Sequence, residues 1–472
     1  MELSVAFHTL GCKLNQLETE SLADAFAKRG FAVLDGEAGG AADLLVVNTC
    51  AVTGKAEQKA RHFVRHALAA NPGAIALVTG CYAQVEPGAI DALHERAIVV
   101  PGGEKSLLLR LPAWLAEEWQ GRGDLLDAVL AFRRAAAGGA ADPFAFSPDE
   151  FSFHSRPSLK IEDGCDNACA YCRVRIARGR ARSLSADEVL ARLRFLEAGG
   201  KAEVVLAGVN LFQYDDGHRR FPSLLRFLLE GTEKIAIRLS SYEPEGVNAD
   251  FLDVFAHPRL RPHIHLPVQS GSDGVLRRMA RAYRRDKVVV ACDALRQVKG
   301  DPFIAADLIA GFPGESDGDF AATLDLARRC DFAWIHAFPF SPRPGTAAWA
   351  MGPKVPERVA GERVRALGDL ARRGRESNIA RHIGKEIEAV LEGGRPTAEG
   401  GTARATSANY LKLLVEDLPA GLACGAAIRC RIGRPFENGP EAAPDGVAGG
   451  EGLCDTRATY ANHRSGTLLS IE

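Results

Sequence analysis

Apolar runs that end in a turn recur along the first hundred residues, and a polar stretch of helical periodicity follows each one. The runs are SVAFHTLGC, LLVVNTC and AIALVTGC. Continuous apolar strands that alternate with helices are typical of a parallel sheet buried on both faces. The pattern therefore predicts an N-terminal parallel α/β domain over residues 1–120.

The periodicity fades over residues 121–150, which are rich in Ala, Gly, Pro and Phe, and this composition predicts an interdomain linker with some helix. A second series follows, with apolar runs near SLKIEDGC, EVVLAGVN, IAIRLSSYEP, HIHLPVQSGS, FIAADLIAGFP and WIHAFPFSP. Helical patterns separate these runs. The alternation predicts a (β/α)6 partial barrel over residues 151–383, which ends in a long charged helix.

Short alternating runs divided by Gly and Pro turns occupy residues 384–435, and they predict a small β-barrel. Residues 436–472 are acidic and rich in Gly and Pro at first, which predicts a flexible tail. The predicted fold class is α/β: an N-terminal parallel domain, a central partial barrel and a small C-terminal β-barrel.

Composition limits the classes of function. The chain has 472 residues and a formal net charge of −2, so its overall charge does not indicate a nucleic-acid partner. No window reaches the roughly 18 apolar residues of a membrane span, and the N-terminus lacks the pattern of a secretory signal. We therefore expect a cytoplasmic protein with no membrane association. In a reducing compartment, the 11 cysteines favour ligands or redox groups over disulfides.

Cys165, Cys169 and Cys172 form a C-x3-C-x2-C motif directly after the first strand of the barrel series. Three thiolates in one loop can bind three irons of a cubane cluster and leave the fourth iron without a protein ligand. The alternative is a structural zinc site. Such sites usually show two paired motifs, and this sequence has no second C-x2-C.

This motif resembles that of the radical S-adenosylmethionine superfamily. The resemblance implies a [4Fe-4S] cluster on these catalytic cysteines, with S-adenosylmethionine bound at the open iron as the source of a 5′-deoxyadenosyl radical. Tyr171 fits an aromatic contact for the adenine. Positions on and after the later strands supply further candidates for cofactor binding, each of which is otherwise an ordinary turn or capping residue: Gly208, Asn210, Gln269, Ser270, Asp307 and Gly311.

Cys12, Cys50 and Cys81 are far apart in sequence, but each lies at the carboxyl end of a predicted strand of the N-terminal sheet. Those ends face one crevice in an open α/β sheet, so the three thiols are candidates for a shared metal site. The alternative is that they are ordinary buried cysteines.

With this second set, the chain resembles the methylthiotransferases over nearly its whole length up to about residue 434. Segments that carry the resemblance include GCKLNQLETE, VVNTCAVT, VTGCYAQ, IEDGCDNACAYC, HLPVQSGSD, AGFPGE and FPFSPRPGT. The resemblance implies a second [4Fe-4S] cluster on Cys12, Cys50 and Cys81, which holds the sulfur to be transferred. S-adenosylmethionine is then used twice, as methyl donor and as radical source.

GCKLNQLETE, ARGRARS and the RPGT loop look like the group of methylthiotransferases that acts on N6-threonylcarbamoyladenosine in tRNA. The implied reaction is 2-methylthiolation of the adenosine immediately 3′ of the anticodon. The implied partners are tRNA, an electron donor such as flavodoxin or ferredoxin, and a sulfur donor that the sequence leaves open. Arginines at 173–182 either pair with phosphates or the threonyl carboxylate, or form a solvated basic loop.

The C-terminal module resembles the TRAM domain, a small β-barrel that helps to hold RNA. Lys412, Arg429 and Arg431 are candidates for phosphate contacts. Tyr410 either stacks on a base or belongs to the core.

Three alternatives remain open from the residues. In the first, the enzyme acts on isopentenyl-adenosine in tRNA. In the second, it acts on an aspartate of a ribosomal protein. In the third, the chain is a non-catalytic RNA-binding protein with structural zinc. His257, His263 and His265 suggest a metal site less readily than alternating strand residues. The other cysteines have no partner spacing and are expected to be core or incidental thiols.

Overall fold

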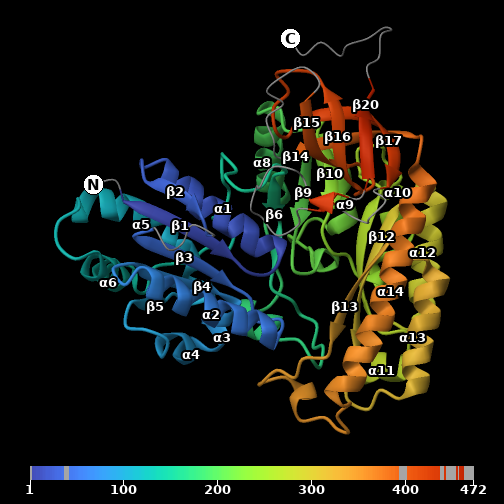
Figure 1. Cartoon of the computed structure of the whole chain (residues 1–472), viewed down its shortest axis with the longest axis horizontal. Helices are drawn as coiled ribbons and strands as arrows, with labels where there is room; N and C mark the ends of the chain where they lie inside the picture. The colour runs from blue at the N-terminus through green and yellow to red at the C-terminus, as the bar shows by residue number, and fades with distance from the viewer. Residues whose placement is uncertain are drawn as a thin grey trace.

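The computed structural model describes residues 3–36, 42–392, 401–435, 441–442, 453–454 and 456–461. Figure 1 shows an N-terminal sheet with helices on both faces, a larger array of strands and helices beside it, and a small barrel near the C-terminus. The predicted α/β fold class, with a closed β-barrel at the C-terminus, is confirmed.

Parallel strands in the order β2-β1-β3-β4-β5 form the N-terminal sheet. Their bounds are β1 Ser4–Thr9, β2 Ala32–Asp35, β3 Leu44–Thr49, β4 Ile75–Gly80 and β5 Ala97–Val99. The helices that follow them are α1 Lys13–Ala27, α2 Gly54–Ala70, α3 Cys81–Val85 and α4 Pro87–Asp91. Strands β3 and β4 are buried along their whole length, because a separate apolar core covers each face of the sheet.

The expected linker contains a helix that packs on the N-terminal domain. A 3-10 helix, α5 and a π-helix lead to it, with bounds Gly102–Arg110, Leu111–Trp114 and Leu115–Trp119. Helix α6 (Leu125–Ala136) begins at Asp124, whose carboxylate accepts the N–H of Leu126. Val129 and Phe132 of α6 are buried in the core that lies under β1 and β3.

The central domain contains two three-stranded parallel sheets, β10-β9-β6 and β11-β12-β13. Isolated parallel bridges join Ile237 of β10 to Leu260, which precedes β11, and Ser241, which follows β10, to His265 of β11. The strands are β6 Ser158–Lys160, β9 Glu203–Ala207, β10 Ala236–Leu239, β11 His263–Gln269, β12 Phe303–Ala310 and β13 Trp334–Pro339. All six lie within the apolar runs that predict them.

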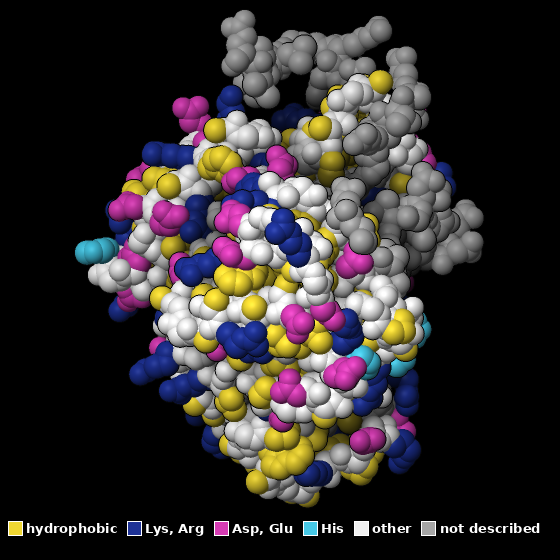
Figure 2. Space-filling view, turned by 90° about the vertical axis from the view of Figure 1, so that its left-hand side faces the viewer, with side chains coloured by type: hydrophobic (Ala, Val, Ile, Leu, Met, Phe, Trp, Pro, Cys, Tyr) yellow, Lys and Arg dark blue, Asp and Glu magenta, His cyan; other side chains and the backbone are white. Residues whose placement is uncertain are grey.

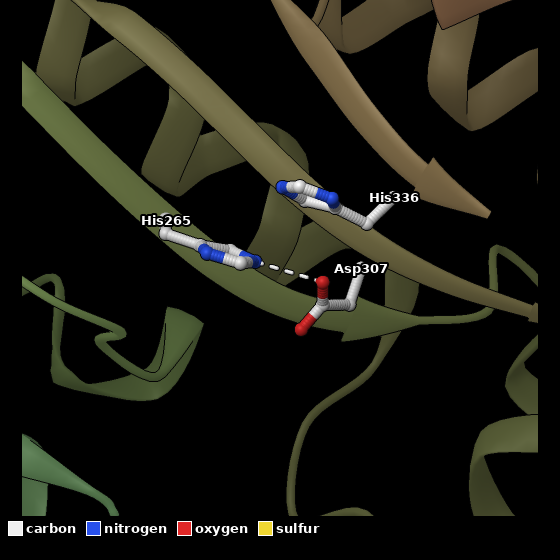
Figure 3. A group of neighbouring side chains, drawn as sticks. All are labelled: His265, Asp307 and His336. Atoms are coloured by element: carbon white, nitrogen blue, oxygen red, sulfur yellow. Dashed lines mark ion pairs between the residues drawn. The ribbon is translucent and has the colours of Figure 1, made fainter. Parts of the chain in front are cut away.

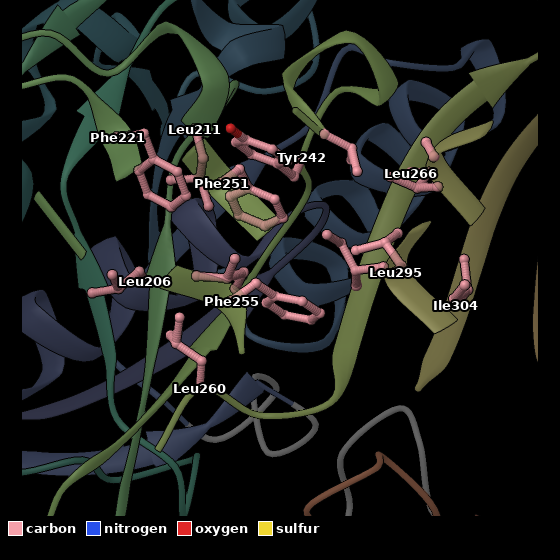
Figure 4. Close-up of a cluster of buried hydrophobic side chains, with 14 of the residues drawn as sticks. Leu206, Leu211, Phe221, Tyr242, Phe251, Phe255, Leu260, Leu266, Leu295 and Ile304 are labelled. Carbon is pink, nitrogen blue, oxygen red and sulfur yellow. The ribbon is translucent and has the colours of Figure 1, made fainter. Parts of the chain in front are cut away.

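Helices cover the outer face of these strands, and Figure 4 shows part of the core between the two layers, with the ring of Phe251 next to that of Tyr242. The main helices are α8 Ala186–Ala198, α9 Phe221–Glu230, α10 Ala249–Phe255, α11 Asp273–Arg278, α12 Arg285–Lys299 and α13 Asp317–Cys330. The shorter elements are β7 Glu162–Asp163, α7 Val174–Arg178, β8 Arg182–Ser183 and three 3-10 helices at Leu211–Gln213, Pro244–Gly246 and Ala347–Trp349.

The long helix α14 (Glu357–His382) leads into a closed barrel of order β14-β15-β16-β20-β17. Its strands are β14 Glu386–Glu392, β15 Gly401–Ser407, β16 Lys412–Leu418, β17 Ala427–Pro435 and β20 Thr456–Tyr460. Strand β20 closes the barrel by pairing with β16 and β17. The barrel therefore extends past residue 435, where the sequence predicts only a tail.

Most of the expected acidic tail lies outside the described residues, apart from β20 and the short pair β18 (Glu441–Ala442) and β19 (Leu453–Cys454). The prediction of a flexible tail rested on composition, which does not reveal strand β20. Thr456 and Ala458 alternate with exposed Arg457, so a short strand with one buried face follows an acidic segment. Among the described residues, no helix is both long and apolar enough to cross a membrane.

Candidate active site

The loop that carries Cys165, Cys169 and Cys172 runs from β7 to α7, at the carboxyl end of the first barrel strand. All three thiols are partly buried. Burial raises the pKa of Cys172 to about 12, and the neighbouring thiols of Cys169 and Cys165 raise it as well. Three neighbouring thiols do not all ionise unless a cation offsets the negative charge of the thiolates. Bound metal ions supply such a positive charge.

Hydrogen-bond donors point at these sulfurs. The N–H of Val174 lies 3.4 Å from Sγ of Cys172, and Nη1 of Arg281 lies 3.1 Å from Sγ of Cys169. Arg281 also pairs with the buried carboxylate of Glu243. Cluster-bound thiolates accept such bonds, so this donor set fits an iron–sulfur cluster.

Glu162 and Asn210 form a polar pair beside the same loop. The backbone N–H of Asn210 donates to Oε2 of Glu162 at 2.8 Å, and burial raises the pKa of Glu162 to about 8. The side-chain amide of Asn210 is buried and has no partner of good geometry among the described residues. Buried amides are normally paired, so this one fits the polar groups of a bound cofactor.

The other expected cofactor residues fall into two groups. Tyr171 is partly buried against an apolar cluster that includes Met279 and Phe312, and Gly208 packs so closely on Glu162 that a Cβ would lie 2.8 Å from its Oε2. Tyr171 lies within the cysteine loop itself, between Cys169 and Cys172, and Gly208 lies next to Glu162, just before that loop.

Residues on the later loops have structural contacts as well. Gln269 is buried with a φ of 64°, and Oγ of Ser270 lies 3.2 Å from Oγ1 of Thr323 on α13. The N–H of Gly311 donates to Glu315, and a Cβ on Gly311 would lie 2.6 Å from that of Ala360 on α14. Asp307 lies within β12, three residues before that strand ends, and pairs with His265.

Cys12, Cys50 and Cys81 follow β1, β3 and β4, which are adjacent in the sheet, so the predicted placement at three strand ends is observed. Gly11 has a φ of 113°, and a Cβ on it would lie 2.8 Å from the Cβ of Cys50. Burial raises the pKa of Cys50 to about 12, and the nearby thiols of Cys12 and Cys81 also raise it. The structure therefore places the second set of thiols at neighbouring strand ends, although the three sulfurs do not all lie within 4.8 Å of one another.

Charged side chains fill the space between the two domains beside this second set. Glu18 of α1 accepts from Lys105 at 2.5 Å, and from Lys160 and Arg178 at 2.9 Å each. Asp163 pairs with Lys160 and Arg178 at 2.8 and 3.0 Å.

This network has three cations and two carboxylates, so it carries one excess positive charge. Burial alone would lower the pKa of Arg178, but Glu18, Asp163 and the thiols of Cys81 and Cys12 raise it. A cavity of about 70 Å³ adjoins the network and Cys81. The excess charge fits an anionic cluster on Cys12, Cys50 and Cys81.

The arginines at 173–182 do not form one basic surface. Arg173 is buried and pairs with Glu57 and Glu86, and Arg178 belongs to the interdomain network. The other three, Arg175, Arg180 and Arg182, are exposed. Figure 2 shows basic and acidic side chains interspersed on one face of the molecule.

The C-terminal barrel uses Tyr410 to contact the central domain. The Tyr410 ring lies 4.2 Å from that of His263 and 5.4 Å from that of Phe303, so the structure favours the core alternative over base stacking. Lys412 pairs with Glu392 and Arg431 with Glu386, whereas Arg429 is exposed.

Sequence reasoning missed Glu162 and Glu18. Glu162 had a detectable signal, because a carboxyl group in a buried strand just before the first cysteine requires a partner or a function. Glu18 had none nearby, since Lys105 and Lys160 lie 87 and 142 residues away in sequence.

Two family models match the chain. The Radical SAM superfamily matches residues 159–327, and "Uncharacterized protein family UPF0004" matches residues 4–102. The radical S-adenosylmethionine methyltransferase TsrM from Kitasatospora setae, solved with cobalamin and a [4Fe-4S] cluster, is a structural neighbour. The superposition has a TM-score of 0.51 at 14% sequence identity and covers 74% of this chain and 77% of TsrM. At this identity the likeness supports the fold alone.

Curated relatives cover nearly the whole chain. Threonylcarbamoyladenosine tRNA methylthiotransferase MtaB of Treponema pallidum is 43% identical over 91% of this chain and 98% of its own length. The Bacillus subtilis protein of the same name is 32% identical, over 92% and 96%. tRNA-2-methylthio-N(6)-dimethylallyladenosine synthase of Anaeromyxobacter dehalogenans is 34% identical, over 91% and 92%.

Proposed function

The chain belongs to the radical S-adenosylmethionine superfamily and, within it, to the threonylcarbamoyladenosine tRNA methylthiotransferases, and from this membership we propose its reaction and its site. The protein methylthiolates C2 of N6-threonylcarbamoyladenosine next to the anticodon of tRNA. The observation that supports this best is the pair of three-cysteine sets in two domains that a buried charge network joins.

Two [4Fe-4S] clusters and S-adenosylmethionine are the cofactors of this reaction. When bound, they supply one-electron chemistry, a methyl group and an iron that binds sulfur. We assign one cluster to Cys165, Cys169 and Cys172, which are the catalytic set, and the other to Cys12, Cys50 and Cys81.

The surrounding residues then have defined roles. Arg281 donates to Cys169 and offsets negative charge on the first cluster, while Glu243 holds the guanidinium in place. Asn210, whose side-chain amide is buried beside Cys165, would offer that amide to S-adenosylmethionine. The network around Glu18 fixes the N-terminal domain, which would hold the second cluster, against the barrel.

The reaction requires partners besides tRNA. We propose an electron donor such as flavodoxin or ferredoxin, because the catalytic cluster must be reduced at each turnover. Sulfur must also be replenished, so we propose a sulfur donor as a further partner. A tRNA substrate places the enzyme in the cytoplasm.

A second candidate substrate is dimethylallyladenosine in tRNA, because a relative named for that product matches the chain at 34% identity. A structural-zinc protein without catalysis would lack iron altogether.

The test uses anaerobically reconstituted enzyme and anticodon stem-loop RNAs that carry either modified base. We expect methylthiolation of the threonylcarbamoyl RNA by the wild type. Cys172→Ala should abolish cleavage of S-adenosylmethionine, whereas Cys50→Ala should retain cleavage but form no methylthio product. Product formation by Cys50→Ala would refute the assignment of the second cluster, and a colourless protein with zinc and no iron would refute the enzyme.

A further inference from the structure

The inner face of the barrel carries a polar cluster that the reaction described above does not use. Side chains of β11, β12 and β13 alternate between two environments, and Leu266, Ala306 and Ile335 lie in the core under the helices. Their neighbours His265, Asp307 and His336 therefore face the barrel interior. Figure 3 shows the three side chains directed toward one another from adjacent strands.

The cluster is compact and open to solvent. One nitrogen or oxygen atom from each residue lies within 4.8 Å of the other two. The rings of His265 and His336 stack with centroids 5.2 Å apart, and Nε2 of His265 lies 2.9 Å from Oδ1 of Asp307. The side chains of His265 and Asp307 are 23% and 25% exposed although they lie inside the barrel, so the interior is not filled at this level.

The position of the cluster suits a substrate group. Below it, at the start of β11, Tyr410 of the C-terminal barrel packs on His263 and closes the floor. Above the cluster lies Glu243, whose pKa is raised to about 7 by burial and also by the nearby charges of Glu245 and Asp307. Glu243 in turn holds the Arg281 that contacts Cys169. The cluster thus lies between the floor of the barrel and the catalytic cysteines.

The position of the ring hydrogen of His336 determines whether the cluster binds a metal ion or an anionic group. Nε1 of Trp334 donates to Nδ1 of His336 at 3.3 Å. An indole N–H only donates, so Nδ1 of His336 accepts and the ring hydrogen is on Nε2. A protonated Nε2 has no lone pair for a metal ion, but it donates well to an anionic oxygen.

Asp307 and His265 complement this donor. A carboxylate only accepts, and each carboxylate accepts several hydrogen bonds, so Asp307 can bind N–H and O–H groups of a ligand. Nε2 of His265 is close to Asp307 but not aligned with it, since it has no hydrogen-bond partner of good angle among the described residues. The cluster therefore combines a ring N–H of His336, the carboxylate of Asp307 and a buried ring nitrogen of His265 that is poorly aligned with that carboxylate.

We propose that His265, Asp307 and His336 bind the threonylcarbamoyl group of the substrate base, an inference that rests on the proposed function. Nε2–H of His336 donates to the threonyl carboxylate. Asp307 accepts from the threonyl hydroxyl or the urea N–H, and His265 completes the contact. These contacts select the modified base, because unmodified adenosine has neither the carboxylate nor the hydroxyl.

The test measures how well the holoenzyme discriminates between two anticodon stem-loop RNAs, one with N6-threonylcarbamoyladenosine and one with adenosine at the same position. A hydrogen bond to a charged group contributes about tenfold to a hundredfold in affinity. We expect His336→Phe, which keeps a stacking ring but removes the donor, to lose preference for the modified RNA by that factor. Affinity for the adenosine RNA and cleavage of S-adenosylmethionine should not change.

Two further variants separate loss of the hydrogen bond from a general effect of the substitution. His336→Gln keeps a side-chain N–H and should regain part of the preference. His66→Phe makes the same change at an exposed residue of α2 and should behave as wild type.

Wild-type preference in His336→Phe would overturn this inference. So would an additional bound metal ion, beyond cluster iron, that this variant loses. Failure of the wild type to methylthiolate the modified RNA would instead refute the proposed function, so the two failures are distinguishable.

Discussion

Glu18 is a buried carboxylate that lies among Lys105, Lys160 and Arg178. Burial alone would raise its pKa, but the three cations hold that pKa well below the usual range of a glutamate. The group is therefore ionised in the folded protein. Its value to the fold depends on the partners, because an unpaired buried charge is strongly destabilising.

We predict that Glu18→Gln lowers the free energy of unfolding by about 3 to 5 kcal/mol, since it leaves buried cations without their shared partner. Chemical denaturation of the holoenzyme measures this loss. Because the pKa of Glu18 is depressed in the folded protein, the stabilisation is fully present above a pH of about 4.3, the usual pKa of glutamate. It declines as pH falls from there through the lower pKa of the folded state. Glu118→Gln, at an exposed residue of the π-helix, is the matched control. Equal stability of the two variants would contradict the account.

Residue types in a local pattern were predictable from sequence, and residue contacts were not. The C-x3-C-x2-C spacing lies within one loop, so the sequence shows which thiols are neighbours. The role of Tyr410 depends on His263 and Phe303, which belong to another domain. For the same reason, no local pattern shows that Arg173 and Arg178 are buried in ion pairs.

The strand ends of the N-terminal sheet position the second set of cysteines. Cys12, Cys50 and Cys81 follow three adjacent parallel strands, and Gly11 allows the first of these turns to approach Cys50 closely. A side chain at position 11 would meet both a left-handed backbone and the Cβ of Cys50.

We predict that Gly11→Ala disrupts the second cluster while sparing the first, because the displaced turn carries Cys12. Iron should fall from about eight to about four atoms per chain. Cleavage of S-adenosylmethionine should persist without methylthiolation. Gly88→Ala, at a glycine with no heavy atom within 4 Å of the added Cβ, should keep its full iron content. A full iron content in Gly11→Ala would show that this approach is not required.

Elements with strong apolar runs were predictable, and weak ones were not. The runs at β3, β4 and β9 are continuous and fully buried, which is the strongest signal that a parallel sheet gives. Strands β2 and β5 are short, with four and three residues, and produce little pattern. Strand β20 pairs with β16 and β17, so its place depends on strands distant in sequence.

Ion pairs also fasten the C-terminal barrel to the floor of the central domain. Glu203 of β9 is buried and pairs with Arg238, Arg261 and Arg156. Arg156 and Arg261 continue to Glu392 and Glu388 of β14. The charges of these arginines outweigh burial and lower the pKa of Glu203 to about 2.

We predict that Glu203→Gln destabilises the holoenzyme by about 3 kcal/mol at neutral pH, because three arginines then share one carboxylate fewer. The folded pKa is depressed, so the effect should be complete above a pH of about 4.3 and vanish as pH falls toward 2. Urea denaturation at several pH values measures it, with the exposed Glu233→Gln as control. A pH-independent difference between Glu203→Gln and wild type would be inconsistent with a charge effect.

At the scale of the whole molecule, the sequence predicted the parts but not how they dock. Domain contacts depend on buried charges from distant segments, such as Arg156 with Glu392 at a separation of 236 residues. These contacts place the floor of the barrel under the polar cluster and the second set of cysteines beside the central domain. The arrangement divides the reaction between two thiol sets that act on one base.

Mass spectrometry of nucleosides from total tRNA tests this central claim most directly, in cells without the gene that are complemented with wild type or with Cys50→Ala. We predict that 2-methylthio-N6-threonylcarbamoyladenosine disappears on deletion, that its unmethylthiolated precursor accumulates, and that only the wild type restores the product. Persistence of the product after deletion, or its return with Cys50→Ala, would contradict the account.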